Sequence, residues 1–376
     1  MPKSTRKRVL LVCGGRSTEH RISLISCCSL LNAIDRTKFA PIVAGIGLDG
    51  VWHYYGDKEF VLNSGDPEHV ALTPKAPVCF PMPTGKGAAL VFEDGKRKPV
   101  KFDIALPMLH GSFGEDGTIQ GLFEMLDVPY VGCDVAASAN CMDKERTKVL
   151  ASSLLGIKVA PFYAFEEDDN VPVEEIVKDL GLPLFVKPAS SGSSVGITRV
   201  EKAEDLDEAL DEAFRFDRKV LVEQAVLGAR EIECAVLEED DGLVVADPGE
   251  IIPKDDFYDF NGKYLSDSAR LQVPAKLPKK SREMIREAAA MVFNALECGG
   301  MARVDFFYKP PKKDGTGEEI ILNEVNTIPG FTSISLYPKM MENSGIGYAE
   351  LVTKLLENGF VRHSAQQRDS HNQHHH

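Results

Sequence analysis

The stretch RVDFFYKPPKKDGTGEEIILNEVN (303–326) contains two apolar runs that flank a segment rich in Pro, Lys and Gly. This pattern predicts a β-hairpin. The Asp-Gly pair at 314–315 is a strong signal for a two-residue turn, and a turn centred there places Asp305 directly opposite Glu324. Because side chains alternate along a strand, Asn326 then shares the face of Glu324. The hairpin therefore predicts three oxygen-bearing side chains on one patch of a sheet.

Two carboxylates that face each other on a sheet repel, unless a cation lies between them. A hard cation such as Mg²⁺ accepts carboxylate and amide oxygens, and it would remove the repulsion between Asp305 and Glu324. Arg303 lies on the same face as Asp305 in this register. The alternative is a solvated strand face, because strand carboxylates more often face water.

The composition is that of an ordinary globular protein, with 376 residues, 43% of them hydrophobic and 27% charged. This length allows two or three domains. The formal net charge of −14 argues against a general nucleic-acid binder, which carries a basic patch. No apolar run approaches the roughly 18–20 residues that span a bilayer, so we expect no membrane association. Eight cysteines without a CxxC pair predict buried thiols in a reducing cytoplasm.

The first third of the chain alternates strand and helix patterns. Residues 17–33 predict a helix, and three short apolar runs predict buried strands, at 8–13, 40–47 and 102–109. This alternation predicts a parallel sheet covered on both faces. Active sites lie beyond the carboxyl ends of such strands, where two polar Gly-rich segments fall, GGRSTEHRISL (14–24) and HGSFGEDG (110–117).

A Pro-, Gly- and charge-rich excursion at 56–101 separates these segments from the rest of the chain. A helix is predicted from an N-cap at Asp143 to Leu155, where Gly156 ends it. Further elements follow in order: two strands around a Ser/Gly loop (182–200), a helix (202–216), strands at 220–224 and 230–237, a polar loop (253–270), and a helix (281–297) capped by Ser281. The polar C-terminal segment lacks periodicity, and we expect residues 365–376 to form a disordered tail.

The segment KPASSGSSVG (187–196) places a lysine at the end of an apolar strand, followed by a loop of serines and glycines. Such a loop offers backbone N–H groups and hydroxyls to phosphate oxygens. It is not a P-loop, because it lacks the GK[ST] ending and a strand follows it, so a flexible connector is the alternative. Lys144 lies in the first turn of its helix, where the helix dipole disfavours a cation unless an anion binds nearby. For Lys144 the alternative is a solvated charge beside Arg146 and Lys148.

Acidic residues also mark two later strands. Glu223 closes one strand, while Glu231 and Glu233 share a face of the next. These carboxylates either accept hydrogen bonds from an adenine amine and ribose hydroxyls or face water. The loop DFYDFNGKYLSDSARL (256–271) contains four aromatic residues, which suits either a loop that closes over a ligand or one packed on its own domain.

The order of these features resembles the ATP-grasp superfamily and, within it, the D-alanine–D-alanine ligase family. The resemblance runs from about Lys7 to Arg362 and rests on eight segments in order: GGRSTEHRISL, LHGSFGEDG, CMDKERTK, LPLFVKPASSGSSVG, REIECAVL, DFYDFNGKY, GMARVDFF and NEVNTIPGFTSISLYPKM. It implies an α/β fold, α+β in the C-terminal part, with a three-domain ATP-grasp architecture and an N-terminal Rossmann-like parallel-sheet domain. The implied parts are a substrate domain (1–138), a central ATP-grasp subdomain with the phosphate-covering loop (139–222), a C-terminal ATP-grasp subdomain with the metal site (223–364), and the tail (365–376).

The resemblance implies ATP-dependent ligation of two D-alanines for peptidoglycan synthesis. The first carboxylate attacks the γ-phosphate to give an acyl phosphate, which the second amine then attacks, releasing phosphate. The implied cofactors are ATP and two Mg²⁺ ions, or Mn²⁺ in their place, held by Asp305, Glu324 and Asn326. We expect a cytoplasmic homodimer whose partners are the small molecules D-alanine and ATP, with no nucleic acid and no membrane.

The resemblance also assigns the nucleotide-binding residues. Lys144 and Lys187 hold phosphates, under a covering loop formed by Ser190, Ser191, Gly192, Ser193, Ser194 and Val195. Glu223 accepts from the adenine amine and Glu231 from the ribose, while Phe257 packs near the base.

On the substrate side, the resemblance implies that Glu19 pairs with the first ammonium group. Arg303 and the Gly330 N–H form an oxyanion hole. Lys263, Ser335 and the Leu336 N–H hold the second carboxylate, and His110 has a positioning role. Ser193 and Tyr264 link the loop to Glu19, which closes the site against water.

Three other functions compete with this one. A ligase that joins D-alanine to another amino or hydroxy acid is the first, although DFYDFNGKY matches the dipeptide-forming type. A nucleotide-binding regulatory protein is the second, and it would not need every metal ligand and the oxyanion donor. A dinucleotide-binding oxidoreductase is the third, but no GxGxxG follows the first strand.

Overall fold

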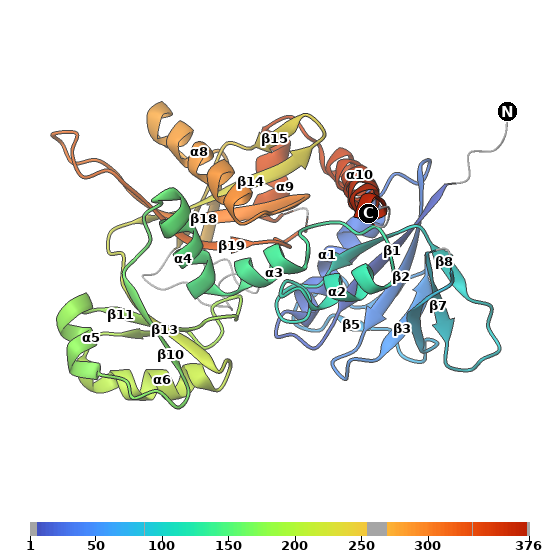
Figure 1. Cartoon of the computed structure of the whole chain (residues 1–376), viewed down its shortest axis with the longest axis horizontal. Helices are drawn as coiled ribbons and strands as arrows, with labels where there is room; N and C mark the ends of the chain where they lie inside the picture. The colour runs from blue at the N-terminus through green and yellow to red at the C-terminus, as the bar shows by residue number, and fades with distance from the viewer. Residues whose placement is uncertain (1–5, 86, 254–268, 333, 374–376) are drawn as a thin grey trace.

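The computed structural model describes residues 6–85, 87–253, 269–332 and 334–373. Figure 1 shows three main sheets with helices packed around them, at the right, at the lower left and at the upper centre in chain order. The first sheet is largely parallel and the other two are antiparallel, which confirms the predicted α/β class with an α+β C-terminal part.

The first sheet has the strand order β3-β2-β1-β9. β1 pairs in parallel with both β2 and β9, whereas β3 is an antiparallel edge. The bounds are β1 (Lys7–Gly14), β2 (Phe39–Ile46), β3 (Trp52–Gly56) and β9 (Ile104–Met108), and α1 (His20–Ala33) packs against β1. The three parallel strands are the three predicted apolar runs. Because their carboxyl ends meet at one edge, the polar segments that follow β1 and β9 lie close together.

The excursion between β3 and β9 forms two small antiparallel sheets. β4 (Val61–Leu62) pairs with β5 (Ala71–Leu72), and a second sheet contains β6 (Cys79–Pro83), β7 (Ala88–Phe92) and β8 (Val100–Phe102). Leu90 and Phe92 are buried in the same core as Leu10 and Trp52, so the excursion packs on the first sheet. After β9, α2 (Thr118–Met125) and α3 (Val135–Met142) lead toward the second sheet.

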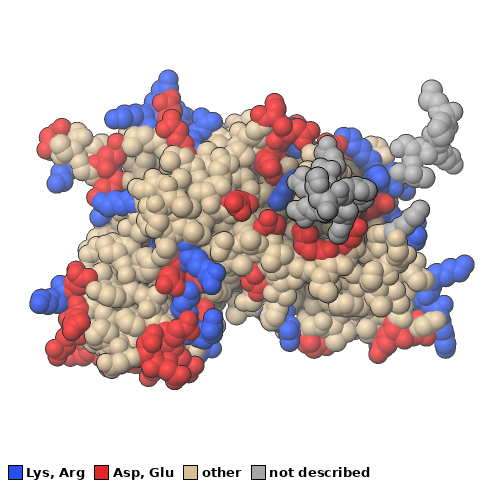
Figure 2. All heavy atoms as spheres, in the orientation of Figure 1, with Lys and Arg blue, Asp and Glu red and all other residues tan. Residues whose placement is uncertain are grey.

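The second sheet has the order β10-β13-β11-β12. Its strands are β10 (Phe162–Glu166), β11 (Leu184–Pro188), β12 (Thr198–Val200) and β13 (Lys219–Gln224). A 3₁₀ turn (Ala203–Asp205) and two helices, α5 (Val173–Leu180) and α6 (Leu206–Phe214), cover the sheet, and Ile176 and Leu210 bury against Val186. The outer faces of these helices are acidic, as Figure 2 shows at the lower left.

The third sheet has the order β17-β16-β14-β18-β19, with β15 paired to β14. The strands are β14 (Arg230–Glu239), β15 (Gly242–Val245), β16 (Gly249–Pro253), β17 (Ala269–Gln272), β18 (Met301–Lys309) and β19 (Glu319–Asn326). Ile232, Cys234 and Val236 face the core under α8 (Lys279–Ala295). Ala235 and Leu237 face the opposite core, under α9 (Leu336–Asn343) and α10 (Tyr348–Gln373). This alternation directs Glu231 and Glu233 away from α8.

Helix ends agree with the sequence in one case and differ in two. The Asp143 side chain caps α4 (Lys144–Leu155) by accepting the Arg146 N–H, and Gly156 ends it at φ 64°. Ser281 does not cap α8, because the helix already begins at Lys279 and the Ser281 hydroxyl donates to Glu318. The segment expected to be a disordered tail continues α10 as far as Gln373.

The hairpin of β18 and β19 pairs Asp305 with Glu324, as predicted. The turn differs from the prediction, because the strands are joined by residues 310–318 rather than by two residues. A β-bulge at Asn323 inserts one extra residue into β19. The pairs next to the turn, such as Lys309 with Glu319, would place Asp305 opposite Asn323, and the one-residue shift at the bulge restores its pairing with Glu324.

All eight cysteines are free thiols, and only Cys28 is more than marginally exposed. Within the described part of the chain, every helix is either too short or too polar to cross a bilayer.

Candidate active site

Two adjoining cavities lie where the three sheets meet. The smaller has a volume of about 350 Å³ and the larger about 660 Å³. Five residues line both cavities and form a shared wall: Lys144, Ser191, Ser193, Ile251 and Glu324. The predicted site residues are divided between the cavities, and three of them that were assigned to phosphates, to the covering loop or to the metal lie at the wall: Lys144, Ser193 and Glu324.

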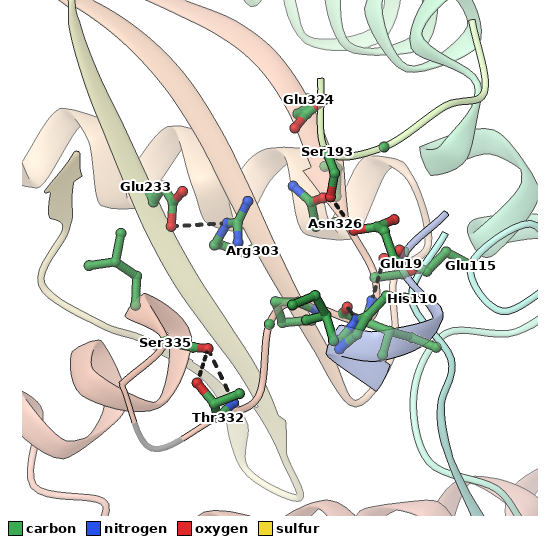
Figure 3. A pocket seen from close by; sticks show the side chains of 18 of the residues that line it. Glu19, His110, Glu115, Ser193, Glu233, Arg303, Glu324, Asn326, Thr332 and Ser335 are labelled. Atoms are coloured by element: carbon green, nitrogen blue, oxygen red, sulfur yellow. Dashed lines mark hydrogen bonds and ion pairs between the residues drawn. The ribbon is translucent and has the colours of Figure 1, made fainter. Parts of the chain in front are cut away.

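The smaller cavity, shown in Figure 3, contains most of the residues assigned to amino-acid substrates. Its lining includes Glu19, His110, Arg303, Asn326, Gly330, Ser335 and Leu336. These side chains come from the first parallel sheet and from the third sheet with its following loop. The cavity is therefore formed only when the two ends of the chain pack together.

Glu19 occupies the position before the first residue of α1, where its side chain makes no capping hydrogen bond, and it is 5% exposed. The Ser193 hydroxyl donates a hydrogen bond to its carboxylate, so the loop after β11 is tied to the segment between β1 and α1. Gly111 and Gly192 allow this approach, because a Cβ at either position would lie less than 3 Å from Glu19 Oε2. Tyr264, the other residue expected in this link, lies outside the described residues, as do Lys263 and Phe257.

His110 and Glu115 together hold the backbone of Ile328. The Ile328 N–H donates to Glu115 Oε1 at 3.0 Å, and its carbonyl accepts from His110 Nδ1 at 2.9 Å. Glu115 Oε2 accepts the Gly111 N–H at 2.8 Å, while His110 Nε2 lies 2.9 Å from the Ser26 hydroxyl. Ile328 lies between Asn326 and Gly330, so this two-point contact fixes the segment that carries a predicted metal ligand and a predicted oxyanion donor. Sequence reasoning missed Glu115, although it belongs to the quoted HGSFGEDG motif.

Burial affects the protonation of both residues. Burial, together with the nearby Glu19 carboxylate, raises the pKa of Glu115 to about 8. The hydrogen bonds that it accepts from two backbone N–H groups lower the pKa, but by less. Burial lowers the pKa of His110, so its imidazole is neutral at pH 7. A neutral ring that donates from Nδ1 to the Ile328 carbonyl accepts at Nε2 from Ser26, which fits a positioning role.

Arg303 lies between two carboxylates on neighbouring strands. Its guanidinium makes two hydrogen bonds to Asp305, at 2.8 and 2.7 Å, and its Nε is 3.1 Å from Glu233 Oε2. Glu233 and Asp305 are opposite each other in the β14–β18 register. Glu233 was noticed in the sequence as a neighbour of Glu231 on one strand face, but it received no role. The two anions hold the Arg303 side chain at the wall of the smaller cavity.

The predicted metal ligands do meet at the hairpin. Asn326 Nδ2 donates to Asp305 Oδ2 at 2.9 Å, and Glu324 Oε2 is 3.6 Å from the Lys144 ammonium. Among the described residues, no three His, Cys, Asp or Glu side chains form a metal-binding group. The donor set fits Mg²⁺ because it supplies two paired carboxylates and an amide oxygen next to both cavities.

The larger cavity contains residues assigned to the nucleotide. Lys144, Lys187, Ser194, Glu223 and Glu231 line it. Lys144 Nζ donates to the Ser191 carbonyl at 2.6 Å, which joins the first turn of α4 to the loop. The lysine that the helix dipole disfavours therefore has a hydrogen-bond acceptor in the loop and a counter-charge in Glu324.

Lys148 was named in the sequence only as a neighbour of Lys144 and received no role. The alternative of a solvated charge concerned Lys144, which is buried, whereas the side chain of the neighbouring Arg146 is 64% exposed. Lys148 instead is fully buried, and its Nζ lies 3.2 Å from Glu223 Oε2. The signal was the spacing of four residues from Lys144, which places both lysines on one face of α4.

The loop after β11 adopts an unusual backbone conformation. Ser193 and Ser194 have φ of 53° and 60°, in the left-handed region that disfavours residues other than glycine. The Ser190 N–H donates to Asp217 and the Val195 N–H to the Gly192 carbonyl, and neither residue lines a cavity. Within the predicted covering loop, Ser191 to Ser194 therefore face the cavities.

Ser335 begins α9 at the other end of the smaller cavity. Its hydroxyl accepts the Thr332 N–H at 3.1 Å and lies 2.8 Å from the Thr332 hydroxyl. Figure 3 shows this pair across the cavity from Glu19. The start of a helix binds anions, so this end suits a carboxylate.

Comparison with known proteins agrees with this arrangement. Models of the D-ala D-ala ligase N-terminus and C-terminus match residues 8–133 and 151–357. The D-alanine–D-alanine ligase A of Chromobacterium violaceum is 45% identical over 353 residues, which cover 93% of this chain and 94% of the relative. The D-alanine–D-alanine ligase of Caldicellulosiruptor bescii is 44% identical, with 94% of each chain covered.

Solved structures give the same result. The D-alanine-D-alanine ligase from Coxiella burnetii matches with a TM-score of 0.81 at 33% identity, covering 96% of each chain. The VanG D-Ala:D-Ser ligase from Enterococcus faecalis matches with a TM-score of 0.79 at 37% identity, covering 94% of this chain and 100% of that one. Because the two family models together match most of the chain and the relatives align over nearly its whole length, the chain belongs to the D-alanine–D-alanine ligase family.

Proposed function

We propose that this protein joins two D-alanines into D-alanyl-D-alanine at the expense of ATP, as its family membership implies. The observation that carries the proposal is the shared wall between the two cavities, where Lys144, Ser193 and Glu324 line both. A carboxylate bound in the smaller cavity and a γ-phosphate bound in the larger can meet only at this wall.

The reaction proceeds in two steps. An oxygen of the first D-alanine carboxylate attacks the γ-phosphorus, which gives an acyl phosphate and ADP. The second D-alanine amine then attacks the acyl carbon, and phosphate leaves with the carboxylate oxygen. Glu19 orients the first ammonium group, while Ser335 and the Leu336 N–H at the start of α9 bind the second carboxylate.

Arg303 and the Gly330 N–H stabilise the oxyanion of the tetrahedral intermediate. Arg303 suits this role because Glu233 and Asp305 hold its guanidinium in place. His110 and Glu115 hold Ile328 and so keep the Gly330 segment in position. The bond from Ser193 to Glu19 closes the loop over the site and excludes water from the acyl phosphate.

Lys144 and Lys187 bind ATP phosphates under the loop from Ser190 to Val195. Glu231 binds the ribose and Glu223 the adenine amine. Asp305, Glu324 and Asn326 would hold two Mg²⁺ ions, or Mn²⁺, which offset the negative charge of the phosphates and the attacking carboxylate. Phe257, Lys263 and Tyr264 complete the proposal on resemblance alone, with roles at the base, the second carboxylate and the closing loop.

The proposed cellular role is the supply of dipeptide for peptidoglycan in the cytoplasm, by a homodimer. The proposed division of the chain is a substrate domain (1–138), a central ATP-grasp subdomain (139–222) and a C-terminal one (223–364). Light scattering on the purified protein tests the dimer.

The function is tested by phosphate release from ATP with D-alanine, with L-alanine and without an amino acid. We expect release with D-alanine and formation of the dipeptide in equal amount. Equal release in all three reactions would contradict the proposal. An additional reaction with D-alanine and D-serine tests the second subsite, because one structural relative is named a D-Ala:D-Ser ligase.

A further inference from the structure

Glu223, at the end of β13, is held from both of its oxygens by two lysines on different elements. Lys187 from β11 lies 3.1 Å from Oε1, and Lys148 from α4 lies 3.2 Å from Oε2. The glutamate is 2% exposed, and the Lys148 side chain is fully buried. Among the described residues, these two lysines form all the ion pairs of Glu223.

The two lysines differ in what else they can reach. Lys187 lines the larger cavity together with Glu223, so its ammonium group is within reach of a bound nucleotide. Lys148 lines neither cavity, and its direct ion pair is with Glu223. Its helix is held in place, because Lys219 Nζ binds Asp143 at 2.5 Å and Glu145 at 2.6 Å.

A bound phosphate would compete with Glu223 for Lys187. If Lys187 moved to a phosphate and no other cation were present, Glu223 would become a buried carboxylate without a counter-charge, which is strongly unfavourable. Lys148 removes this obstacle, because it pairs with the oxygen of Glu223 that Lys187 does not use.

We propose that Lys148 is a positioning residue that keeps the negative charge of Glu223 paired with a cation. Lys187 can then leave this carboxylate and bind a nucleotide phosphate, an inference that rests on the proposed ATP-dependent function. The charges of the cluster agree with this role. Although burial alone would raise it, the two lysines lower the pKa of Glu223, so the carboxylate is ionised. Burial lowers the pKa of Lys148, while the Glu223 carboxylate opposes that shift.

The exchange makes a specific prediction for nucleotide binding. Lys148→Met keeps the length of the side chain but removes its charge, so Lys187 stays committed to Glu223. We expect ADP to bind about 10- to 100-fold more weakly, which corresponds to one charge-assisted interaction. Adenosine has no phosphate, so its affinity should change less than about twofold.

Titration calorimetry with ADP and with adenosine measures both affinities without turnover. Arg146→Met is the matched control, because Arg146 is an exposed cation on the same helix, and it should leave both affinities unchanged. Lys148→Arg restores the charge and should recover ADP affinity. Equal losses for ADP and adenosine in Lys148→Met would show a merely structural role, and an unchanged ADP affinity would also overturn the proposal.

The background variant Glu223→Gln covers the case in which Lys148→Met does not fold. With an uncharged residue at position 223, no counter-charge from Lys148 is needed. Adding Lys148→Met should therefore not weaken ADP binding further. A further loss in that double variant would overturn the exchange. If the unmodified protein bound no ADP at all, the proposed function itself would fail, which separates the two results.

Discussion

The two cavities differ in the balance of charge on their walls. The larger cavity is lined by four acidic and four basic side chains, whereas the smaller is lined by four glutamates but only Lys144 and Arg303 as permanent cations. An acidic cavity suits the ammonium groups of amino acids, yet the reaction also requires their carboxylates to bind there. In the proposed function, Arg303, the backbone around Gly330 and the start of α9 are the anion-binding groups of the smaller cavity. If the proposed roles hold, the comparison teaches that substrate binding depends on a few fixed donors, while nucleotide binding depends on lysines that can exchange partners.

The largest expected loss of turnover comes from the predicted metal ligands at and beside the shared wall. Asp305→Asn or Glu324→Gln removes charge from the predicted metal site, and we expect turnover to fall on the order of a thousandfold or more. Steady-state dipeptide formation measures the loss. The fold should survive, so unfolding of either variant at the temperature where the unmodified protein is stable, without ATP, would indicate a structural role instead.

The second prediction separates the two cavities. Lys187→Met removes a phosphate-binding cation from the larger cavity only, and we expect ATP affinity to fall about 10- to 100-fold. The KM for D-alanine should change little, since Lys187 does not line the smaller cavity. Unchanged nucleotide affinity would remove Lys187 from the phosphate site.

The third prediction concerns the fixed donors of the smaller cavity. Glu115→Gln replaces one acceptor oxygen with a donor that faces a backbone N–H, so the Gly330 segment should shift. We expect kcat to fall about tenfold at most, the cost of roughly one hydrogen bond, with KM for ATP unchanged. A change in KM for ATP with kcat retained would mean that this contact serves the other cavity.

The same residue makes stability depend on pH. Its pKa is about 8 in the folded protein and close to 4.5 in an unfolded chain, so between these values the folded state binds the additional proton. The contribution of Glu115 to the free energy of unfolding is therefore greatest below pH 4.5 and decreases as the pH rises toward 8. Urea unfolding at pH 5, 6.5 and 8 should show a steeper decline for the unmodified protein than for Glu115→Gln, and parallel curves would refute this assignment.

The smallest expected effect is at the closing loop. Ser193→Ala removes the hydrogen bond to Glu19, which shifts the closed population by about tenfold at most. We expect a modest decrease in rate and more ATP hydrolysed per dipeptide, because water reaches the acyl phosphate; Tyr264→Phe is expected to behave in the same way. The ratio of phosphate to dipeptide measures this, and a ratio that stays at one in both variants would argue against closure by this loop.

Local sequence patterns indicated the residues of the larger cavity better than those of the smaller one. The strand that ends at Lys187, the Ser/Gly loop and the carboxylate at Glu223 are each visible within a few residues of sequence. The hairpin pairing of Asp305 with Glu324 was also predicted, although a longer turn and the bulge at Asn323 produce it together. The spacing of four residues places Lys148 on the face of Lys144, but it does not show that this face is buried, because the burial goes with the pairing of Lys148 with Glu223 on β13.

The smaller cavity depends on contacts between distant parts of the chain. Ser193 and Glu19 are 174 residues apart, and Glu115 and Ile328 are 213 residues apart. Spacing and periodicity carry no information about such pairs, so resemblance to the family supplied Glu19 and nothing supplied Glu115. The prediction that Ser281 caps its helix was wrong for a similar reason. The Ser281 hydroxyl donates to Glu318, which is 37 residues away in the chain.

The central claim is that a carboxylate in the smaller cavity reaches a phosphate in the larger one across the wall of Lys144, Ser193 and Glu324. D-alanine labelled with ¹⁸O in its carboxylate tests this directly, with mass spectrometry of the phosphate released during dipeptide formation. If the carboxylate attacks the γ-phosphate, one labelled oxygen must leave with phosphate for every dipeptide formed. Dipeptide formation with unlabelled phosphate would contradict the account.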